Sequence, residues 1–204
     1  QRAGQIIQRI RAFVKRSEPN PTPSEVPQMV NNAIELADIE LRRQQVRLTP
    51  YVAARMPMLV ADPILIEQVL INLLKNAGEA IAQANRPQGE RNVELRVAPR
   101  RIDNQDVVEF EVRDSGNGVP DELIERIYEA FYSTKSEGMG IGLKLCRSIV
   151  ESHQGRMRVE NLYNGADVTG CCFSFWIPVT PRFQPQGSPD VAANEPLTDT
   201  EKAR

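Results

Sequence analysis

The sequence is poor in the residues that would tie it to a metal, a disulfide framework or a membrane. It has three cysteines, Cys146, Cys171 and Cys172, and one histidine, His153. An odd cysteine count with no C-x-x-C pair argues against a zinc site and indicates reduced thiols, which favours a cytoplasmic location. No apolar run approaches the roughly 18–20 residues that span a bilayer, and no signal peptide is present.

The sequence also lacks a strong excess of charge of either sign. Its 25 Lys and Arg residues nearly balance 27 Asp and Glu residues, for a net charge of −2. We therefore expect no nucleic-acid partner and no membrane contact. Apolar and charged contents of 41% and 25% are typical of a soluble globular protein, and 204 residues suggest one domain with appendages. Because the chain begins with Gln1, we expect a piece of something longer.

Composition divides the chain into four parts. Residues 1–18 have apolar side chains at heptad-like spacing and predict a helix too short to stand alone. Its partner would be another helix, a second copy of the chain, or the domain that follows. Residues 19–25 contain three prolines and predict a linker. Residues 26–180 form the domain proper, and residues 181–204, rich in Pro, Asn, Asp and Glu, predict a disordered tail.

Within the domain, periodicity separates helices from strands. Apolar residues recur at helical spacing in four segments and alternate in six others. We expect helices at 26–45, 67–81, 120–131 and 141–152, and strands at 46–52, 58–61, 93–97, 108–112, 157–159 and 171–177. The strands at 93–97 and 108–112 are expected to pair antiparallel.

The helix at 67–81 carries an unusual polar face. Asn72 and Asn76 are four residues apart, with Glu79 one turn further on, so the three side chains share one side of the helix. An amide oxygen at a fixed height is a suitable ligand for Mg²⁺, whose other ligands are water and phosphate oxygens. The alternative is a solvated pair of asparagines on an amphipathic helix, and this helix alone does not decide between them.

Two glycine clusters follow. D-S-G-N-G (114–118) ends a predicted strand, where Gly116 and Gly118 would let the backbone turn and approach a flat ligand. Asp114 is placed to accept a hydrogen bond from an exocyclic amine such as that of adenine, although a simple glycine turn is also possible. G-M-G-I-G-L (138–143) opens a helix, where free N–H groups favour phosphate. It matches neither the Rossmann nor the P-loop pattern.

The ordered set of motifs resembles the catalytic, ATP-binding domain of sensor histidine kinases. This family shares an ATPase superfamily with gyrase, heat-shock chaperones and mismatch-repair proteins. Four segments carry the resemblance: Q-V-L-I-N-L-L-K-N-A-G-E-A (68–80), D-S-G-N-G (114–118), I-Y-E-A-F-Y-S-T-K (127–135) and E-G-M-G-I-G-L (137–143). The residues of the last two segments are most similar to those of nitrogen-, oxygen- and dicarboxylate-sensing kinases.

The resemblance, which covers about residues 26–178, implies an α/β (α+β) fold. We expect a two-layer sandwich of a mixed sheet of about five strands, with three main helices on one face. Residues 1–18 then look like the second helix of the dimerisation and phosphotransfer hairpin.

The resemblance also implies site residues and two cofactors, ATP and Mg²⁺. Asn76 would ligate Mg²⁺ and Asn72 would support phosphate or metal-bound water, both in the catalytic centre, while Asp114 would hold adenine. The residues expected to approach the nucleotide or line its lid are Gly116, Gly118, Gly138, Gly140, Gly142 and Leu143. Lys135 is a phosphate contact or an exposed loop lysine.

Three further residues are expected to be structural. Tyr128 and Phe131 would pack the lid rather than bind the ligand. His153 would be an end-of-helix residue and not a phosphoacceptor.

The implied activity is transfer of the ATP γ-phosphoryl group to a histidine, for relay to an aspartate of a response-regulator receiver domain. The acceptor histidine lies on a hairpin helix that this sequence does not contain, and the whole protein would be a homodimer, free or membrane-anchored. The alternative is a non-catalytic nucleotide-binding regulatory module of the same fold. An ATP-hydrolysing clamp of the gyrase type is disfavoured because Asn72 stands where that branch has a Glu base.

Overall fold

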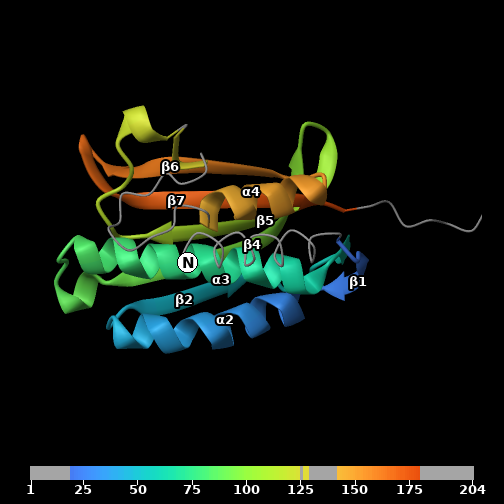
Figure 1. The fold of residues 1–204 in the computed structure, drawn as a ribbon, viewed down its shortest axis with the longest axis horizontal. Helices are drawn as coiled ribbons and strands as arrows, with labels where there is room; N and C mark the ends of the chain where they lie inside the picture. Colours follow the sequence, from blue (N-terminus) through green and yellow to red (C-terminus); the bar gives the residue numbers. More distant parts are fainter. Residues whose placement is uncertain (1–18, 125, 129–141, 180–204) are drawn as a thin grey trace, which may run out of the picture.

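The computed structural model describes residues 19–124, 126–128 and 142–179 (Figure 1). The predictions for residues 1–18 and 181–204 lie outside this part of the chain. So do those for Phe131, Lys135, Gly138 and Gly140.

Three helices and seven strands make up the main elements of this part. The helices are α2 (Val26–Arg43), α3 (Pro63–Gln83) and α4 (Gly142–Ser152). The strands are β1 (Thr22–Glu25), β2 (Arg47–Val52), β3 (Met58–Ala61), β4 (Asn92–Ile102), β5 (Gln105–Asp114), β6 (Arg156–Asn164) and β7 (Asp167–Pro178).

Helix α3 begins where the sequence predicts. Asp62 caps it, since its Oδ1 accepts hydrogen bonds from the backbone N–H groups of Ile64 and Leu65. Pro63 follows in the first turn, where its missing N–H has no cost. The cap and proline fix the starting point of the helix, and therefore the direction in which Asn72 and Asn76 face.

The main sheet is mixed, with strand order β2-β4-β5-β7-β6. Strand β2 pairs parallel with β4, and the remaining neighbours are antiparallel. Strands β1 and β3 form a separate antiparallel pair. The mixed sheet of five strands with three helices confirms the expected fold class.

All three helices lie on one face of the sheet, and the core fills the space between the two layers. Alternate residues of the central strands point into it, including Phe110 on β5 and Phe175 on β7, whose rings stack with centroids 4.6 Å apart. The apolar stripe of α3 supplies the other side of this core: Ile66, Val69, Leu70, Leu73, Leu74, Ala77 and Ile81. In Figure 1, α2 and α3 run side by side, with α4 on the other side of α3.

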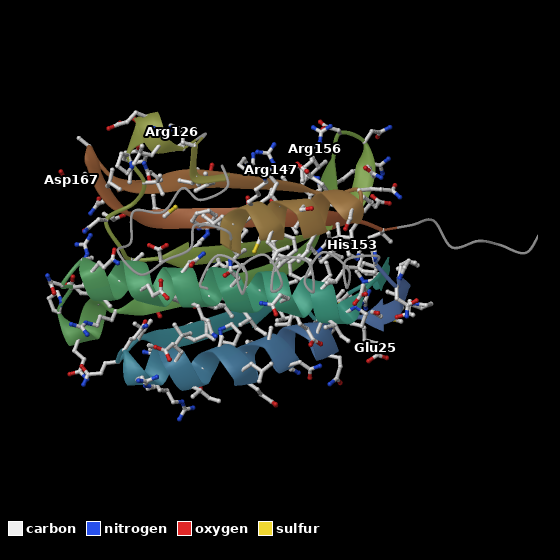
Figure 2. All side chains as sticks on the ribbon, viewed as in Figure 1. Glu25, Arg126, Arg147, His153, Arg156 and Asp167 are labelled. Atoms are coloured by element: carbon white, nitrogen blue, oxygen red, sulfur yellow. The ribbon has the colours of Figure 1, made fainter. Side chains whose placement is uncertain are left out.

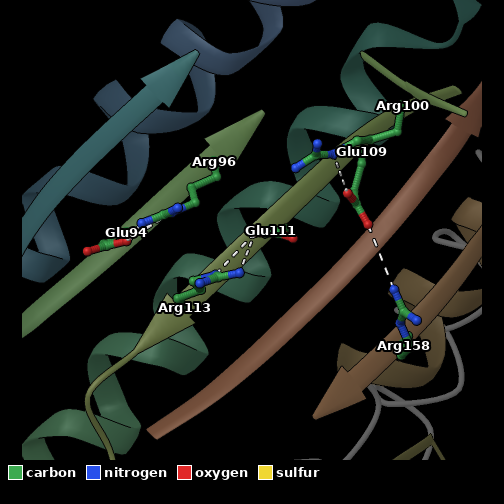
Figure 3. Close-up of polar contacts among 7 residues, drawn as sticks. All are labelled: Glu94, Arg96, Arg100, Glu109, Glu111, Arg113 and Arg158. Atoms are coloured by element: carbon green, nitrogen blue, oxygen red, sulfur yellow. Dashed lines mark hydrogen bonds and ion pairs between the residues drawn. The ribbon is translucent and has the colours of Figure 1, made fainter. Parts of the chain in front are cut away.

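The opposite face of the sheet carries paired charges (Figure 3). Glu109 accepts a hydrogen bond from Arg100 at 3.2 Å and lies 3.9 Å from Arg158. Further along the same face, Arg113 pairs with Glu111 at 3.0 Å. These long side chains cover the strands with their aliphatic stems while the charged groups neutralise one another.

The structure differs from the sequence prediction in three places. The described part of the predicted helix at 120–131 forms two short 3₁₀ turns, Asp121–Leu123 and Arg126–Tyr128. Strands β6 and β7 are longer than predicted and meet at a turn with Gly165 at a φ of 63°. Four residues of the predicted linker form β1. The first difference corrects a prediction, because no α-helix forms at 121–124 or 126–128.

None of the helices described here is long and apolar enough to cross a membrane.

Candidate functional site

The polar face of α3 lies beside α4. Asn72 and Asn76 are both half-buried. The Asn72 Nδ2 donates a hydrogen bond to the Cys146 Sγ on α4 at 3.1 Å. Among the residues that the structure describes, none hydrogen-bonds the Asn76 side chain, so its amide oxygen has its lone pairs available for an outside ligand.

Asp114 is a buried carboxylate at the end of β5, on the same side of the sheet as the helices. Its side chain is only 6% exposed. One oxygen, Oδ1, accepts hydrogen bonds from the backbone N–H groups of Gly116 at 2.8 Å and Cys171 at 3.3 Å. Burial raises the pKa of Asp114 to about 6, and the two hydrogen bonds oppose that rise. Within the described residues Oδ2 accepts no hydrogen bond, which leaves this oxygen open to an outside donor.

The turn after Asp114 is packed so tightly that glycine is required. A Cβ added at Gly116 would lie 2.8 Å from Asp114 Oδ1 and 3.1 Å from the Ala80 side chain on α3. Gly118 has a φ of 73°, and a Cβ there would collide with Val168. Gly170 on β7 lies directly against the Asp114 backbone carbonyl. The backbone at Gly116, Gly118 and Gly170 is therefore packed with no room for a side chain.

Two side chains from distant parts of the sequence hold this turn in place. Arg86, just after α3, donates from Nε to the Ser115 carbonyl at 3.1 Å and from Nη2 to the Gly116 carbonyl at 3.2 Å. Asn161 on β6 binds the Val119 backbone twice, accepting from its N–H and donating to its carbonyl, both at 2.7 Å. The Asp114 carboxylate is thus carried on a rigid turn, as a binding group should be.

Helix α4 begins against the Asn face of α3. A Cβ added at Gly142 would lie 2.9 Å from Asn72 Oδ1, so a larger residue there would require the amide or the helices to move. The first N–H groups of α4 have no partner within the helix and favour an anion. Leu143, predicted to contact the nucleotide, is half-buried and packs against the core.

These groups fit ATP and Mg²⁺ by their chemistry. A carboxylate oxygen that no described residue occupies suits the exocyclic amine of adenine, and a helix start suits phosphate. No cluster of three or more His, Cys, Asp or Glu side chains able to hold a metal occurs among the described residues. That agrees with Mg²⁺ held by one or two protein oxygens together with phosphate and water, and Asn76 offers such an oxygen.

His153, labelled in Figure 2, has a structural position at the end of α4. Its ring is 8% exposed. Nδ1 donates to the Ile149 carbonyl at 2.8 Å, and Nε2 accepts from the backbone N–H of Asp62 at 3.0 Å. The ring therefore ties the end of α4 to the cap of α3, and the expectation of a structural role is confirmed.

The structure brings five predicted residues to one side of the sheet: Asn72, Asn76, Asp114, Gly116 and Gly142. Gly118 shapes the exit of the turn. Lys135, Gly138 and Gly140 lie outside the described residues. For Tyr128, only the backbone is described.

Sequence reasoning missed four residues that support the site: Arg86, Cys146, Asn161 and Gly170. A glycine inside the alternating strand at 167–178 is a recognised sign of close backbone approach and could have indicated Gly170. The other three act through contacts spanning 29 to 74 residues of sequence, for which no local signal exists.

Fold and site together define an ATP-binding domain of the ATPase type. The chain belongs to the family of histidine kinase-, DNA gyrase B- and HSP90-like ATPases, whose family model matches residues 61–181. The family expected from the four motifs is therefore confirmed.

Curated relatives are sensor proteins, among them sensor histidine kinases. The sensor protein FixL of Bradyrhizobium diazoefficiens is 37% identical over 87% of this chain, and the C4-dicarboxylate transport sensor protein DctS of Rhodobacter capsulatus is 38% identical over 76%. The aligned regions are 33% and 23% of those proteins, so the chain spans a third or less of their length.

Solved structures agree. The catalytic domain of histidine kinase ThkA, in a nucleotide-free form, is 28% identical, with a TM-score of 0.63 over 78% of this chain and 96% of that domain. Full-length ShkA in complex with AMPPNP matches the fold with a TM-score of 0.64 at 24% identity, over 80% of this chain and 32% of ShkA.

Proposed function

We propose that this chain is the ATP-binding catalytic part of a two-component sensor histidine kinase. In that role it binds ATP with Mg²⁺ and transfers the γ-phosphoryl group to a histidine on the dimerisation hairpin of the whole protein. The phosphoryl group then passes to an aspartate of a response-regulator receiver domain. The whole protein acts as a homodimer, with this part in the cytoplasm.

The observation that carries the proposal is the Asp114 carboxylate. A buried carboxylate normally has partners for both of its oxygens, since an unsatisfied buried charge is costly. Here two backbone N–H groups occupy Oδ1, and Oδ2 is left to an outside donor. The exocyclic amine of adenine is such a donor, and the glycines beside Asp114 let a flat ring approach the backbone.

The remaining roles follow from position. Asn76 offers an amide oxygen to Mg²⁺, and Asn72 stands one turn earlier, beside the start of α4. Gly116, Gly118 and Gly142 keep the backbone close to the nucleotide, and the family resemblance assigns Lys135, Gly138, Gly140 and Leu143 to the phosphate side. Bound Mg²⁺ supplies the positive charge that offsets charge developing on the transferred phosphoryl group.

The residue at position 72 bears on the choice between kinase and hydrolase. An asparagine amide cannot take a proton from water, whereas a glutamate at this place could. A site without such a base favours transfer of the phosphoryl group to a positioned side chain over hydrolysis. The proposal therefore predicts weak ATPase activity.

The test is calorimetry of ATP binding to the 204-residue chain with Mg²⁺ and with EDTA. Asp114→Asn should weaken binding under both conditions, and Asn76→Ala should weaken binding only when Mg²⁺ is present. Matched controls are Asp106→Asn, an exposed carboxylate at the far end of β5, and Asn31→Ala, an exposed asparagine on α2. Absence of ATP binding by the unmodified chain would overturn the proposal.

A non-catalytic nucleotide-binding module is the second candidate, and a further experiment separates the two. The chain is mixed with a separately made hairpin that carries the acceptor histidine, together with labelled ATP and Mg²⁺. Acid-labile label on the hairpin supports the kinase. ATP binding without any transfer to the hairpin would favour the regulatory module.

A further inference from the structure

The thiol of Cys146 contacts a residue of the proposed site, yet none of the roles above uses it. Cys146 lies on α4 and is 2% exposed. Its Sγ accepts a hydrogen bond from Asn72 Nδ2 at 3.1 Å, and the thiol donates toward the Val69 carbonyl on α3 at 4.0 Å. Burial raises the pKa of Cys146 to about 12, so the thiol keeps the proton that it donates.

This contact decides which end of the Asn72 amide is free. A carboxamide has a donor side and an acceptor side, and a half-turn exchanges them. With one N–H of Nδ2 directed at the sulfur, the amide keeps its orientation, and Oδ1 is the end that offers lone pairs to a ligand. Both ends of the amide lie near the start of α4, since a Cβ at Gly142 would be 2.9 Å from Oδ1 and 3.1 Å from Nδ2. If the amide were turned over, the Nδ2 donor would leave the sulfur and this hydrogen bond would be lost.

We propose that Cys146 is a positioning residue that holds the Asn72 amide with its oxygen toward the bound Mg²⁺. The inference rests on the proposed function and deepens it, because it assigns the Asn72 carbonyl oxygen to the metal ion or its water ligands. A carbonyl oxygen and a phosphate oxygen are both acceptors and cannot hydrogen-bond each other. The same carbonyl oxygen can ligate Mg²⁺ or accept from a metal-bound water. The reversed amide would present its NH₂ group, which donates hydrogen bonds and cannot ligate Mg²⁺.

The Asn72–Cys146 hydrogen bond depends on where α4 holds the sulfur. Sulfur is a weak acceptor, so the Asn72–Cys146 bond is easily lost if its geometry changes. On its other side the Cys146 thiol contacts the carbonyl of Val69 on α3, three residues before Asn72. The Val69 carbonyl, the Cys146 thiol and the Asn72 amide thus form a short chain of contacts, in which α4 provides the sulfur.

The test compares Cys146→Ala, which removes the acceptor, with Cys146→Ser, which keeps one in the same place. ATP affinity is measured for the 204-residue chain with Mg²⁺ and with EDTA. For the alanine variant we expect a loss of about three- to tenfold in Mg²⁺-dependent affinity, the scale of one hydrogen bond. Affinity in EDTA should stay within about twofold of the unmodified chain, and the serine variant should restore most of the Mg²⁺ effect.

A purely structural role for Cys146 would give a different result. Disturbed packing between α3 and α4 would weaken ATP binding equally with and without Mg²⁺, and serine would not rescue it. Either that pattern or an unchanged Mg²⁺ effect in the alanine variant overturns the proposal. Thermal unfolding of each variant checks that all of them are folded under the binding conditions.

A second readout needs no nucleotide. The side-chain NH₂ resonances of Asn72 are assigned by their loss in Asn72→Asp, and their exchange with solvent is then measured. Exchange should be slower in the unmodified chain than in Cys146→Ala. Equal exchange would overturn the inference even if ATP binds as proposed. Slow exchange in a chain that binds no ATP would support the Asn72–Cys146 contact. It would overturn both the assignment of Asn72 to Mg²⁺ and the proposed function.

Discussion

At the scale of single residues, Asp114 links burial, charge and binding. Its carboxyl is held on a rigid turn with a pKa raised to about 6, so its charge changes within an accessible pH range. The ionised form is the better acceptor for an amine donor. Two measurable consequences follow, one for binding and one for stability.

ATP affinity is expected to rise with pH between about 5 and 7. At pH 5 roughly a tenth of the Asp114 carboxyls are ionised, and at pH 7 roughly nine tenths are, for a pKa of about 6. Affinity should therefore increase by up to about tenfold, measured by calorimetry across this range. ATP phosphates also titrate here, so the comparison is with Asp114→Asn, whose profile should be flatter. Parallel profiles for the two proteins would contradict the assignment of Asp114 to adenine.

Asp114 should also make the nucleotide-free fold less stable as pH rises. The folded pKa lies above the unfolded value of 3.8, so the folded state binds this proton more tightly. The stabilisation is complete below about pH 4 and is lost as pH rises through about 6.

Asp114→Asn removes this dependence and keeps the acceptor for Gly116 and Cys171. We expect it to be more stable than the unmodified chain at pH 7.5, by about 1–2 kcal/mol, and to show little gain at pH 4. Urea unfolding at both pH values measures the difference. A variant that is less stable at pH 7.5 would contradict the buried-charge argument.

At the scale of elements, the approach of α4 to α3 depends on Gly142. A Cβ there would meet the Asn72 side chain at 2.9 Å, so the helices would have to separate by a few tenths of an ångström or the amide would have to turn. Gly142→Ala should lower stability by about 1–3 kcal/mol, the usual cost of overpacking, and should also weaken Mg²⁺-dependent ATP binding.

Gly89→Ala is the matched control for this substitution. Gly89 lies on the surface, where an added Cβ would meet nothing within 4 Å. It should leave both the melting temperature and ATP affinity nearly unchanged. Equal effects of the two substitutions on thermal unfolding would show that the α3–α4 contact is not the cause.

The helices and strands also differ in how well the sequence predicts them. Helices α2, α3 and α4 and the paired strands β4 and β5 have clear apolar periods, because each buries one face against a common core. The segment at 121–128 has acidic residues suited to a helix start but only short apolar stretches, and Asn161 fixes the preceding backbone at Val119. Local preference there favoured a helix, and the surrounding contacts favour tighter turns.

The site was predictable only as far as its motifs are local. Asp114, Asn72 and Asn76 stand out by residue type and spacing. The contacts that orient them do not, because Arg86 reaches across 29 and 30 residues to the turn and Asn161 across 42. Such contacts arise from the order of strands in the sheet, and no window of sequence contains both partners.

At the scale of the whole molecule, the two faces of the sheet serve different purposes. The inner face holds the core and, at the end of β5, the Asp114 carboxylate. The outer face carries ion pairs such as Glu109 with Arg100 and Arg158 (Figure 3). Helix α4 is tied to the cap of α3 through His153 at its end, and so the proposed phosphate side at its start and this packing at its end share one element.

This arrangement leads to a prediction about the chain as a phosphoryl acceptor. His153 is the one histidine in the sequence, and both of its ring nitrogens are engaged, Nδ1 as a donor to Ile149 and Nε2 as an acceptor from Asp62. Phosphorylation at either nitrogen would break one of these buried bonds and place a dianion in the core side of α4, which is costly. The chain incubated with labelled ATP and Mg²⁺ should therefore acquire no acid-labile label, while a supplied hairpin with an accessible histidine should acquire it.

His153→Gln should lower the melting temperature, because glutamine replaces only part of this bridge, and should leave transfer to the hairpin intact. Acid-labile label on the unmodified chain that disappears in His153→Gln would make His153 an acceptor and would refute its structural assignment.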